Sequence, residues 1–290
     1  LQRRRFRFAL MQPLRTAAGE LRERSGWLLR LDDHQGAVGW GEVAPLQPHQ
    51  FTACEQALAA LPDELPQAQL EAVLREAPGP VGFGLGAASA ELQGVVGAAS
   101  PQGWLKAPAP ALLLPAGEAM LSALEVASAS MGGLENCTFK WKVATAPDGL
   151  ERQLLEQLLK QLTPTARLRL DANGGWDRST AEAWMQRLRD DPRLDWLEQP
   201  PAAEDQAALA QLAALGPVAL YESLDQHPDP PRPWSGSQVR PPALEGYPRL
   251  LLRALPAGRP QRVPSTACET GIGRRLLAHP AALLAHGPLP

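Results

Sequence analysis

The chain has 290 residues, of which 44% are apolar, enough for one large domain or two smaller domains with substantial cores. Its formal charge is −3, and the arginine cluster in LQRRRFRFAL has no second basic stretch or stacking aromatics with it. No apolar run approaches the ~18 to 20 residues of a membrane span, and the N-terminal residues lack the pattern of a signal peptide. We therefore expect a globular protein with neither nucleic-acid nor membrane partners.

The cysteines and histidines argue against a disulfide framework and a zinc site. Cys54, Cys137 and Cys268 are widely spaced, and the five histidines form no cluster with ligand spacing. This usage is typical of the reducing cytoplasm, which we expect to be the location of the protein.

The first hundred residues predict an α+β unit. Three strand-like stretches, RFRFAL, WLLRLDD and GAVGWGEV, precede helical segments from about Phe51 to Glu76. The Pro- and Gly-rich stretch EAPGPVGFGLG, residues 76–86, is expected to break this unit. GWLKAPAPALLLPAG then reads as a linker, so we place a domain boundary near Lys106, between domains 1–106 and 107–290. The C-terminal tail is expected to be able to pack back on the first domain.

The second domain predicts a TIM-type barrel. Short strands alternate with amphipathic helices such as GLERQLLEQLLKQL, in steps of about 20 to 30 residues, near the ~30 of a barrel unit. No G-x-G-x-x-G follows a strand, which disfavours an open nucleotide-binding sheet. The expected strands are 111–114, 137–143, 166–171, 194–198, 217–222, 236–240 and 261–265.

The stretch TFKWKVA places two ammonium groups on one face of a strand. Because side chains alternate along a strand, Lys140 and Lys142 share one face, and Phe139, Trp141 and Val143 share the other. A solvated strand face explains such a pattern when nothing else accompanies it.

Polar residues end the strands that follow, where barrel enzymes carry their chemistry. Asp171, Glu198 and Glu222 are separated by 27 and 24 residues, about one barrel unit each, so they are expected to stand side by side. Three neighbouring carboxylates repel one another unless a cation lies between them, and oxygen ligands of this kind suit Mg²⁺. The two lysines would face that ion.

The order of these motifs resembles the enolase superfamily. The motifs are K-x-K, DANGGW, LEQP, ALYES and STACETGIG, while GAVGWGEVAPL resembles part of its capping domain. The resemblance implies a (β/α)7β barrel with an N-terminal α+β capping domain. Within the superfamily, the short chain and the late Ser-Thr pair most resemble the o-succinylbenzoate synthase family. These Mg²⁺-dependent lyases dehydrate a cyclohexadiene carboxylate through an enolate, in menaquinone and phylloquinone biosynthesis.

The resemblance also implies roles for individual residues. Lys142 would be the base and Lys140 its charged neighbour, and Asp171 and Glu198 would bind Mg²⁺, with Mn²⁺ as an alternative. The substrate would be a small carboxylate. The remaining implied contacts, to that substrate or to Asp171, come from Arg169, Asn173, Ser265, Thr266, Gly271 and Gly273.

Two residues depart from the family pattern. Tyr221 stands where the family usually has the third carboxylate ligand, so Glu222 reaches the metal only through a bulge or a local shift; otherwise Tyr221 or water completes the site. Arg240 stands where a lysine is usual, and a guanidinium stays protonated, so it can stabilise charge but cannot act as a second base.

Two alternatives to the dehydratase stay open. One is a cycloisomerase or an N-acylamino acid or dipeptide racemase-epimerase of the same fold, which Arg240 disfavours. The other is a non-catalytic member that binds an acidic ligand. The sequence does not indicate the oligomeric state.

Overall fold

The structure is a computed structural model that describes residues 1–16, 19–226, 236–246 and 262–286. Its internal contacts divide the chain into two compact units. The first unit combines Leu1–Pro108 with Arg240–Pro290, and the second is Ala109–Val239. Among the described residues, no helix is both long and apolar enough to cross a membrane.

The first unit begins with an antiparallel sheet of three strands, β1 (Gln2–Thr16), β2 (Gly19–Asp32) and β3 (Val38–Val43). Alternation along β2 points Trp27, Leu29 and Leu31 into a core, where all three are buried. Two expected helical segments follow, α1 (Pro48–Ala60) and α2 (Gln67–Glu76). The strands and helices expected in this region are confirmed.

The expected break at residues 76–86 is wrong. This stretch lies largely in a buried helix, α3 (Gly79–Leu92), with a proline in its first turn where no intrahelical N–H bond is lost. The glycines of β3 let the backbone of α3 approach closely: a Cβ on Gly41 would lie 1.8 Å from the carbonyl oxygen of Gly84. A Cβ on Gly39 would lie 1.9 Å from the carbonyl oxygen of Ala88. Glycine here allows close packing and does not end the helix.

The later part of the first unit contains the short helix α9 (Pro242–Glu245), strand β10 (Arg262–Pro264) and helix α11 (Gly271–His286). Buried Glu42 at the end of β3 receives hydrogen bonds from the backbone N–H groups of Thr270 and Gly273. Gly273 lies in the first turn of α11, so this carboxylate satisfies one of the N–H groups that an α-helix leaves unpaired there. Residues far apart in the sequence are joined in this way within one unit.

The second unit is built on parallel strands with helices between them. The strands are β4 (Leu112–Leu114), β5 (Thr138–Lys142), β6 (Arg167–Asp171), β7 (Leu194–Glu198), β8 (Val218–Leu220) and β9 (Ser237–Arg240). The helices are α4 (Ala119–Met131), α5 (Asp148–Gln161), α6 (Arg178–Leu188), α7 (Gln206–Leu215) and α8 (Ser223–Gln226).

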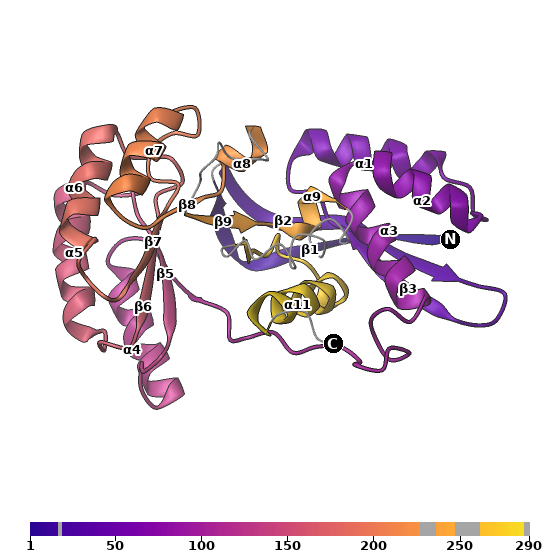
Figure 1. The fold of residues 1–290 in the computed structure, drawn as a ribbon, viewed down its shortest axis with the longest axis horizontal. Coiled ribbons are helices and arrows are strands. Elements are labelled where there is room, and N and C mark those ends of the chain that lie inside the picture. The colour runs from indigo at the N-terminus through magenta and orange to yellow at the C-terminus, as the bar shows by residue number, and fades with distance from the viewer. Residues whose placement is uncertain (17–18, 227–235, 247–261, 287–290) are drawn as a thin grey trace. The chain divides into compact units, whose positions relative to one another are not determined.

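The strand order is β10-β9-β8-β7-β6-β5-β4, so neighbours in the sheet are neighbours in sequence. Helices α5, α6 and α7 lie together on one side of strands β5 to β7 (Figure 1). All seven expected strands are present, and the α/β barrel class with an N-terminal capping unit is confirmed.

The parallel register brings the carboxyl ends of the strands to one level. Lys142 is paired with Asp171, Asp171 with Glu198, and Glu198 with Ala219. On the opposite face of β5, Phe139 and Trp141 are fully buried, which confirms the prediction that the lysines and the apolar residues of TFKWKVA lie on opposite faces of the strand. A single apolar core therefore holds the functional side chains of β5 to β8 in fixed positions.

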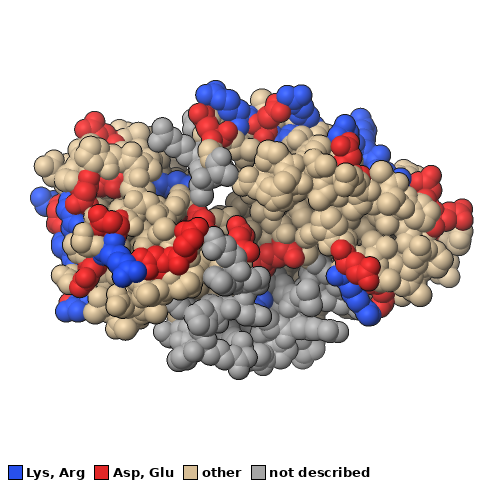
Figure 2. Space-filling view, turned by 90° about the horizontal axis from the view of Figure 1, so that it is seen from above, with Lys and Arg blue, Asp and Glu red and all other residues tan. Residues whose placement is uncertain are grey.

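Charge is mixed on the surface of the described residues. On the face that Figure 2 shows, Lys and Arg side chains lie among Asp and Glu side chains. The arginines of β1 are part of this mixture: Arg3 pairs with Asp63 at 3.2 Å and Arg5 with Glu55 at 2.6 Å.

Candidate active site

The centre of the candidate site is one ammonium group between two carboxylates. Lys140 Nζ lies 2.9 Å from Asp171 Oδ2 and 2.6 Å from Glu198 Oε1. Both carboxylates are almost completely buried, at 1% exposure each. Burial of unpaired charges is costly, so this contact satisfies groups that would otherwise destabilise the fold.

Lys140 and the two carboxylates shift one another's pKa values. Burial disfavours the charge of Lys140, but the carboxylates of Glu198 and Asp171 outweigh burial and raise the lysine pKa. Burial raises the pKa of Glu198, and Asp171 adds to this effect, whereas Lys140 opposes it. The ammonium form of Lys140 is therefore strongly favoured, and Lys140 supplies fixed positive charge.

The second lysine has a different environment. Lys142 Nζ lies 3.9 Å from Asp171 Oδ2 and donates to Asn173 Oδ1 at 2.9 Å. Asn173 in turn donates from Nδ2 to Glu222 Oε1 at 2.8 Å. The loop after β6 thus links a lysine of β5 to a carboxylate that follows β8. Asn173 was expected to contact the substrate, which stays a prediction, and its bridging position was not foreseen.

Tyr221 and Glu222 lie beyond the end of their strand, because β8 ends at Leu220. Glu222 therefore lies outside the strand, so strand alternation does not fix the direction of its side chain, and the turn is a local shift of the kind that a third ligand would need. The chain turns here, with Leu224 N–H donating to the carbonyl of Tyr221 at 2.9 Å. Burial raises the pKa of Tyr221 beyond its ordinary value, and nearby Glu222 adds to this, so the phenol is neutral.

Glu222 is a buried carboxylate that is only partly satisfied by hydrogen bonds. Burial raises its pKa, and the hydrogen bond from Asn173 opposes that shift. Its second oxygen, Oε2, is buried and has no hydrogen-bond partner among the residues that the structure describes. A buried carboxylate oxygen without a donor is costly, and a cation is the partner that would satisfy it.

The donor chemistry of this group fits a hard divalent cation. Asp171, Glu198 and Glu222 offer carboxylate oxygens, and Oε2 of Glu222 is unused. Within the described ranges, no three acidic, histidine or cysteine side chains gather as a complete metal-binding cluster. Glu222 as the third ligand stays a prediction.

Arg169 is paired in register with Lys140 and shares its face of the sheet. Its guanidinium, however, contacts Asp195 and Trp196 of the neighbouring strand β7. Its Nε donates to Asp195 Oδ2 at 2.9 Å, and the group stacks over the ring of Trp196, 4.0 Å from the centroid. Trp196 Nε1 donates to Glu198 Oε2 at 3.3 Å. Arg169 thus supports a residue that holds Glu198, and its expected contact with Asp171 or the substrate stays a prediction.

The other expected residues belong to the first unit. Arg240 is buried and pairs with Glu245 at 2.9 Å, and its carbonyl accepts from Ser265 N–H at 2.6 Å. Thr266 donates its hydroxyl to Glu269. Substrate contacts of Arg240, Ser265, Thr266 and Gly271 stay predictions.

The expected role of Gly273 is corrected. Its N–H donates to Glu42 Oε2 at 2.9 Å and so does not offer itself to the substrate. A Cβ at Gly273 would lie 2.8 Å from that same oxygen. Glycine is therefore needed here because the carboxylate of Glu42 approaches the backbone closely.

Sequence reasoning missed two residues of the site, Trp196 and Gln199. Trp196 lies two residues before Glu198 and Gln199 directly follows it, and Gln199 is completely buried with its amide bonded to the Tyr221–Ser223 turn. The only signal was their place in the stretch DWLEQP beside an expected ligand. Apolar or amide residues in such a stretch carry no chemical pattern of their own.

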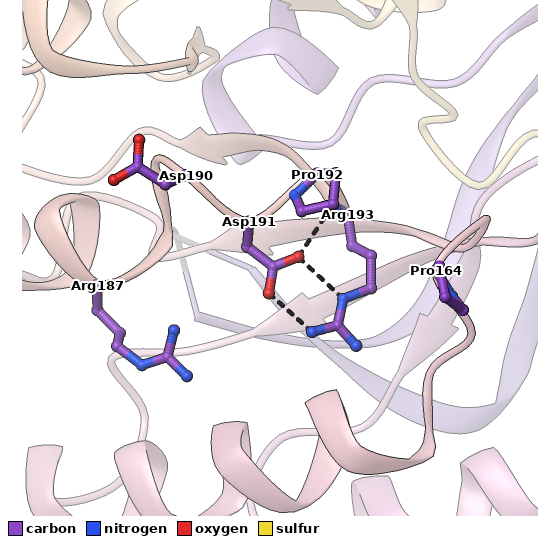
Figure 3. A pocket seen from close by; sticks show the side chains of 6 residues that line it. All are labelled: Pro164, Arg187, Asp190, Asp191, Pro192 and Arg193. Carbon is purple, nitrogen blue, oxygen red and sulfur yellow. Dashed lines mark hydrogen bonds and ion pairs between the residues drawn. The ribbon is translucent and has the colours of Figure 1, made fainter.

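A surface pocket of about 530 Å³ lies elsewhere in the second unit. Its lining is Pro164, Arg187, Asp190, Asp191, Pro192 and Arg193 (Figure 3). Arg193 pairs with Asp191 at 2.7 Å, as Figure 3 shows, and Arg187 pairs with Glu156 at 2.8 Å. Pro164 and Arg193 precede β6 and β7, so this pocket lies at the amino ends of the strands, away from Asp171 and Glu198.

Comparison with known proteins gives consistent matches over most of the chain. Residues 4–92 match the family described as MenC, N-terminal domain, and residues 126–230 match Enolase C-terminal domain-like. The o-succinylbenzoate synthase of Thermosynechococcus vestitus is 37% identical over 93% of this chain and 84% of its own length. That of Edwardsiella ictaluri is 31% identical over 93% and 82%.

Solved structures agree with these matches. The o-succinylbenzoate synthase of Thermosynechococcus elongatus BP-1, with Mg in its active site, superposes with a TM-score of 0.80 at 34% identity, covering 96% of this chain and 88% of that one. The L-Ala-D/L-Glu epimerase of Bacillus subtilis gives a TM-score of 0.68 at 20% identity over 97% and 85%, a likeness of fold alone.

Proposed function

Because the chain belongs to the o-succinylbenzoate synthase family of the enolase superfamily, we propose that it removes water from a cyclohexadiene carboxylate to form o-succinylbenzoate. The reaction is that of a carbon-oxygen lyase and serves the synthesis of menaquinone or phylloquinone. The observation that carries the proposal is the pair of lysines facing buried Asp171 and Glu198 at the carboxyl ends of neighbouring strands.

Lys142 is the base in this proposal. Its Nζ takes the proton from the carbon next to the substrate carboxylate, and the C–H electron pair moves toward that carboxylate. The C–O bond on the neighbouring carbon then breaks. Protonated Lys142 returns its proton to the departing oxygen, so one molecule of water leaves. One base on one face is sufficient for this syn elimination.

The other residues act on charge and position. Lys140 holds positive charge between Asp171 and Glu198, and Asn173 orients Lys142 through the 2.9 Å hydrogen bond. Bound Mg²⁺, or Mn²⁺ in its place, would supply positive charge beside the substrate carboxylate, where negative charge grows as the proton leaves. Asp171, Glu198 and Glu222 would hold it.

Arg240 separates this function from its alternatives. A racemase or epimerase needs a second base on the opposite face, and a guanidinium stays protonated at neutral pH. Arg240 can stabilise developing negative charge without exchanging a proton. The one-base dehydration is therefore favoured over cycloisomerisation or epimerisation, and the lysine pair favours it over a purely ligand-binding role.

We also propose a cellular location and a division into domains. We place the protein in the cytoplasm, in keeping with three cysteines that form no disulfide. Residues 1–106 would act as the capping domain and 107–290 as the barrel domain, and the substrate is a small carboxylate.

Replacing the base tests the function. Lys142→Ala should abolish dehydration and the exchange of the substrate's α-proton in D₂O, measured by absorbance and by NMR, with the melting temperature nearly unchanged. Lys160→Ala, at an exposed lysine of α5, is the matched control and should keep full activity. Near-normal turnover by Lys142→Ala would contradict the assignment. Deuterium entering a dipeptide from both faces would instead support the epimerase.

A further inference from the structure

We propose that Gln199 is a positioning residue that holds the turn carrying Glu222 and the loop carrying Asn173 in a single arrangement. The inference rests on the proposed function for its catalytic consequence, but the contacts that carry it are independent of the reaction. Gln199 directly follows Glu198 at the end of β7 and has no exposed surface.

The side-chain amide of Gln199 uses its whole bonding capacity on residues of neighbouring loops. Oε1 accepts from the backbone N–H groups of Tyr221 at 3.2 Å and Ser223 at 3.1 Å. Nε2 donates to Ser223 Oγ at 2.7 Å and to the carbonyl of Pro201 at 3.2 Å. Two acceptor and two donor positions are all that a glutamine amide has.

These contacts define the direction of Glu222. The residues on either side of it, Tyr221 and Ser223, are bound through their N–H groups to one oxygen atom. The backbone of Glu222 therefore has little freedom to rotate its side chain away from Asn173.

The backbone of Gln199 holds the second loop. Its carbonyl accepts from Gly174 N–H at 2.7 Å, next to Asn173, and its N–H donates to the carbonyl of Ala219 in β8 at 2.8 Å. One residue thus binds the chain next to Asn173 and on both sides of Glu222, the two residues that are linked to Lys142 by hydrogen bonds. A shift of Gln199 would move the partners of the catalytic lysine together.

The conformation of Gln199 supports a positioning role. Its backbone φ is +40°, in the left-handed region that residues other than Gly, Asn and Asp rarely adopt. Such strain persists where surrounding contacts enforce it, and it is concentrated at functional sites.

Two variants separate the amide from the backbone. Gln199→Asn keeps an amide and tolerates positive φ, but it is one carbon too short to reach Tyr221 and Ser223. Gln199→Gly adopts positive φ without strain and removes the side chain. Gln161→Asn, at an exposed residue that ends α5, is the matched control.

The first measurement is amide hydrogen exchange, which needs no substrate. Both Gln199 variants should exchange the Tyr221 and Ser223 amides at least ~10-fold faster than the unmodified protein. The Gly174 amide, bound to the backbone carbonyl, should remain protected in Gln199→Asn. Unchanged protection at residues 221 and 223 in both folded variants would overturn the proposal.

The second measurement is steady-state dehydration. Both variants should lower kcat by at least ~10-fold, because misplaced groups lose near-attack geometry, with a smaller change in KM. Combining Gln199→Asn with Glu222→Gln should give less than the product of the two single effects, since both act on one element. Independent effects would overturn the proposal. If the unmodified protein shows no dehydration, the proposed function fails, and the exchange result alone decides the role of Gln199.

Discussion

Glu222→Gln should make the metal-free protein more stable while impairing its function. One carboxylate oxygen accepts from Asn173 at 2.8 Å, and the other is buried without a hydrogen-bond partner. Glutamine keeps the first bond and removes the charge. An unpaired buried polar group costs ~1–3 kcal/mol and more when it is charged, so removing the charge should give a gain of about 1 to 2 kcal/mol even though the amide nitrogen also lacks a partner. For a chain of this size, that corresponds to a rise in Tm of a few degrees.

The gain should depend on pH in a defined direction. The pKa of Glu222 is raised above the ordinary glutamate value of 4.5, so the native protein loses stability as pH rises from that value through the raised pKa. The glutamine variant does not titrate there. Its advantage should be small below about pH 4.5, grow as pH rises, and level off above the raised pKa.

Urea unfolding between pH 4 and 9 in EDTA measures this difference. Glu125→Gln, at an exposed glutamate of α4, is the control and should show little change. A glutamine variant that is less stable than the unmodified protein, or an advantage that does not vary with pH, would refute the reasoning. Repeating the series with Mg²⁺ tests the third-ligand prediction: the ion should stabilise the unmodified protein more than the variant.

Three further predictions concern other parts of the molecule. Tyr221→Asp restores the family's usual carboxylate and should tighten Mg²⁺ binding by ~10-fold or more in calorimetry, whereas weaker binding would argue against this register. Arg240→Lys should keep much of the dehydration activity, while Arg240→Met should lose about 2 to 4 kcal/mol of transition-state stabilisation in kcat/KM. Equal activity of the two variants would contradict the proposal that Arg240 stabilises negative charge. Gly41→Ala should cost about 3 kcal/mol or more in urea unfolding, since its Cβ would lie 1.8 Å from the carbonyl oxygen of Gly84. Gly149→Ala, with no atom within 4 Å of the added Cβ, should not be destabilising, and equal losses would refute the packing argument.

The parallel strands and the lysine and carboxylate pairs were predictable from sequence, because they depend on short periodic patterns. Alternation along β5 separates Lys140 and Lys142 from Phe139 and Trp141, and the structure shows that separation. Parallel strands end at one level, which brings Asp171 to the lysines.

The remaining features depend on contacts between segments that no local pattern records. Strand β8 is shorter than its apolar pattern suggests, so Glu222 lies in a turn and not in a strand. The side-chain amide of Gln199 binds that turn, and no sequence pattern predicts the hydrogen-bond partners of a glutamine. The helix at residues 79–92 was missed because glycine disfavours an isolated helix, while tertiary packing against β3 favours this one.

The contact between α3 and β3 limits how this part of the chain can change over evolutionary time. In most cores, a substitution that adds volume can be relieved by a second substitution that shortens the neighbouring side chain. Here the atoms facing Gly39 and Gly41 are main-chain carbonyl oxygens of Ala88 and Gly84, which no mutation can shorten. Local suppressor mutations are therefore not available at these two positions, and descendants of this protein must keep both glycines or move the whole helix.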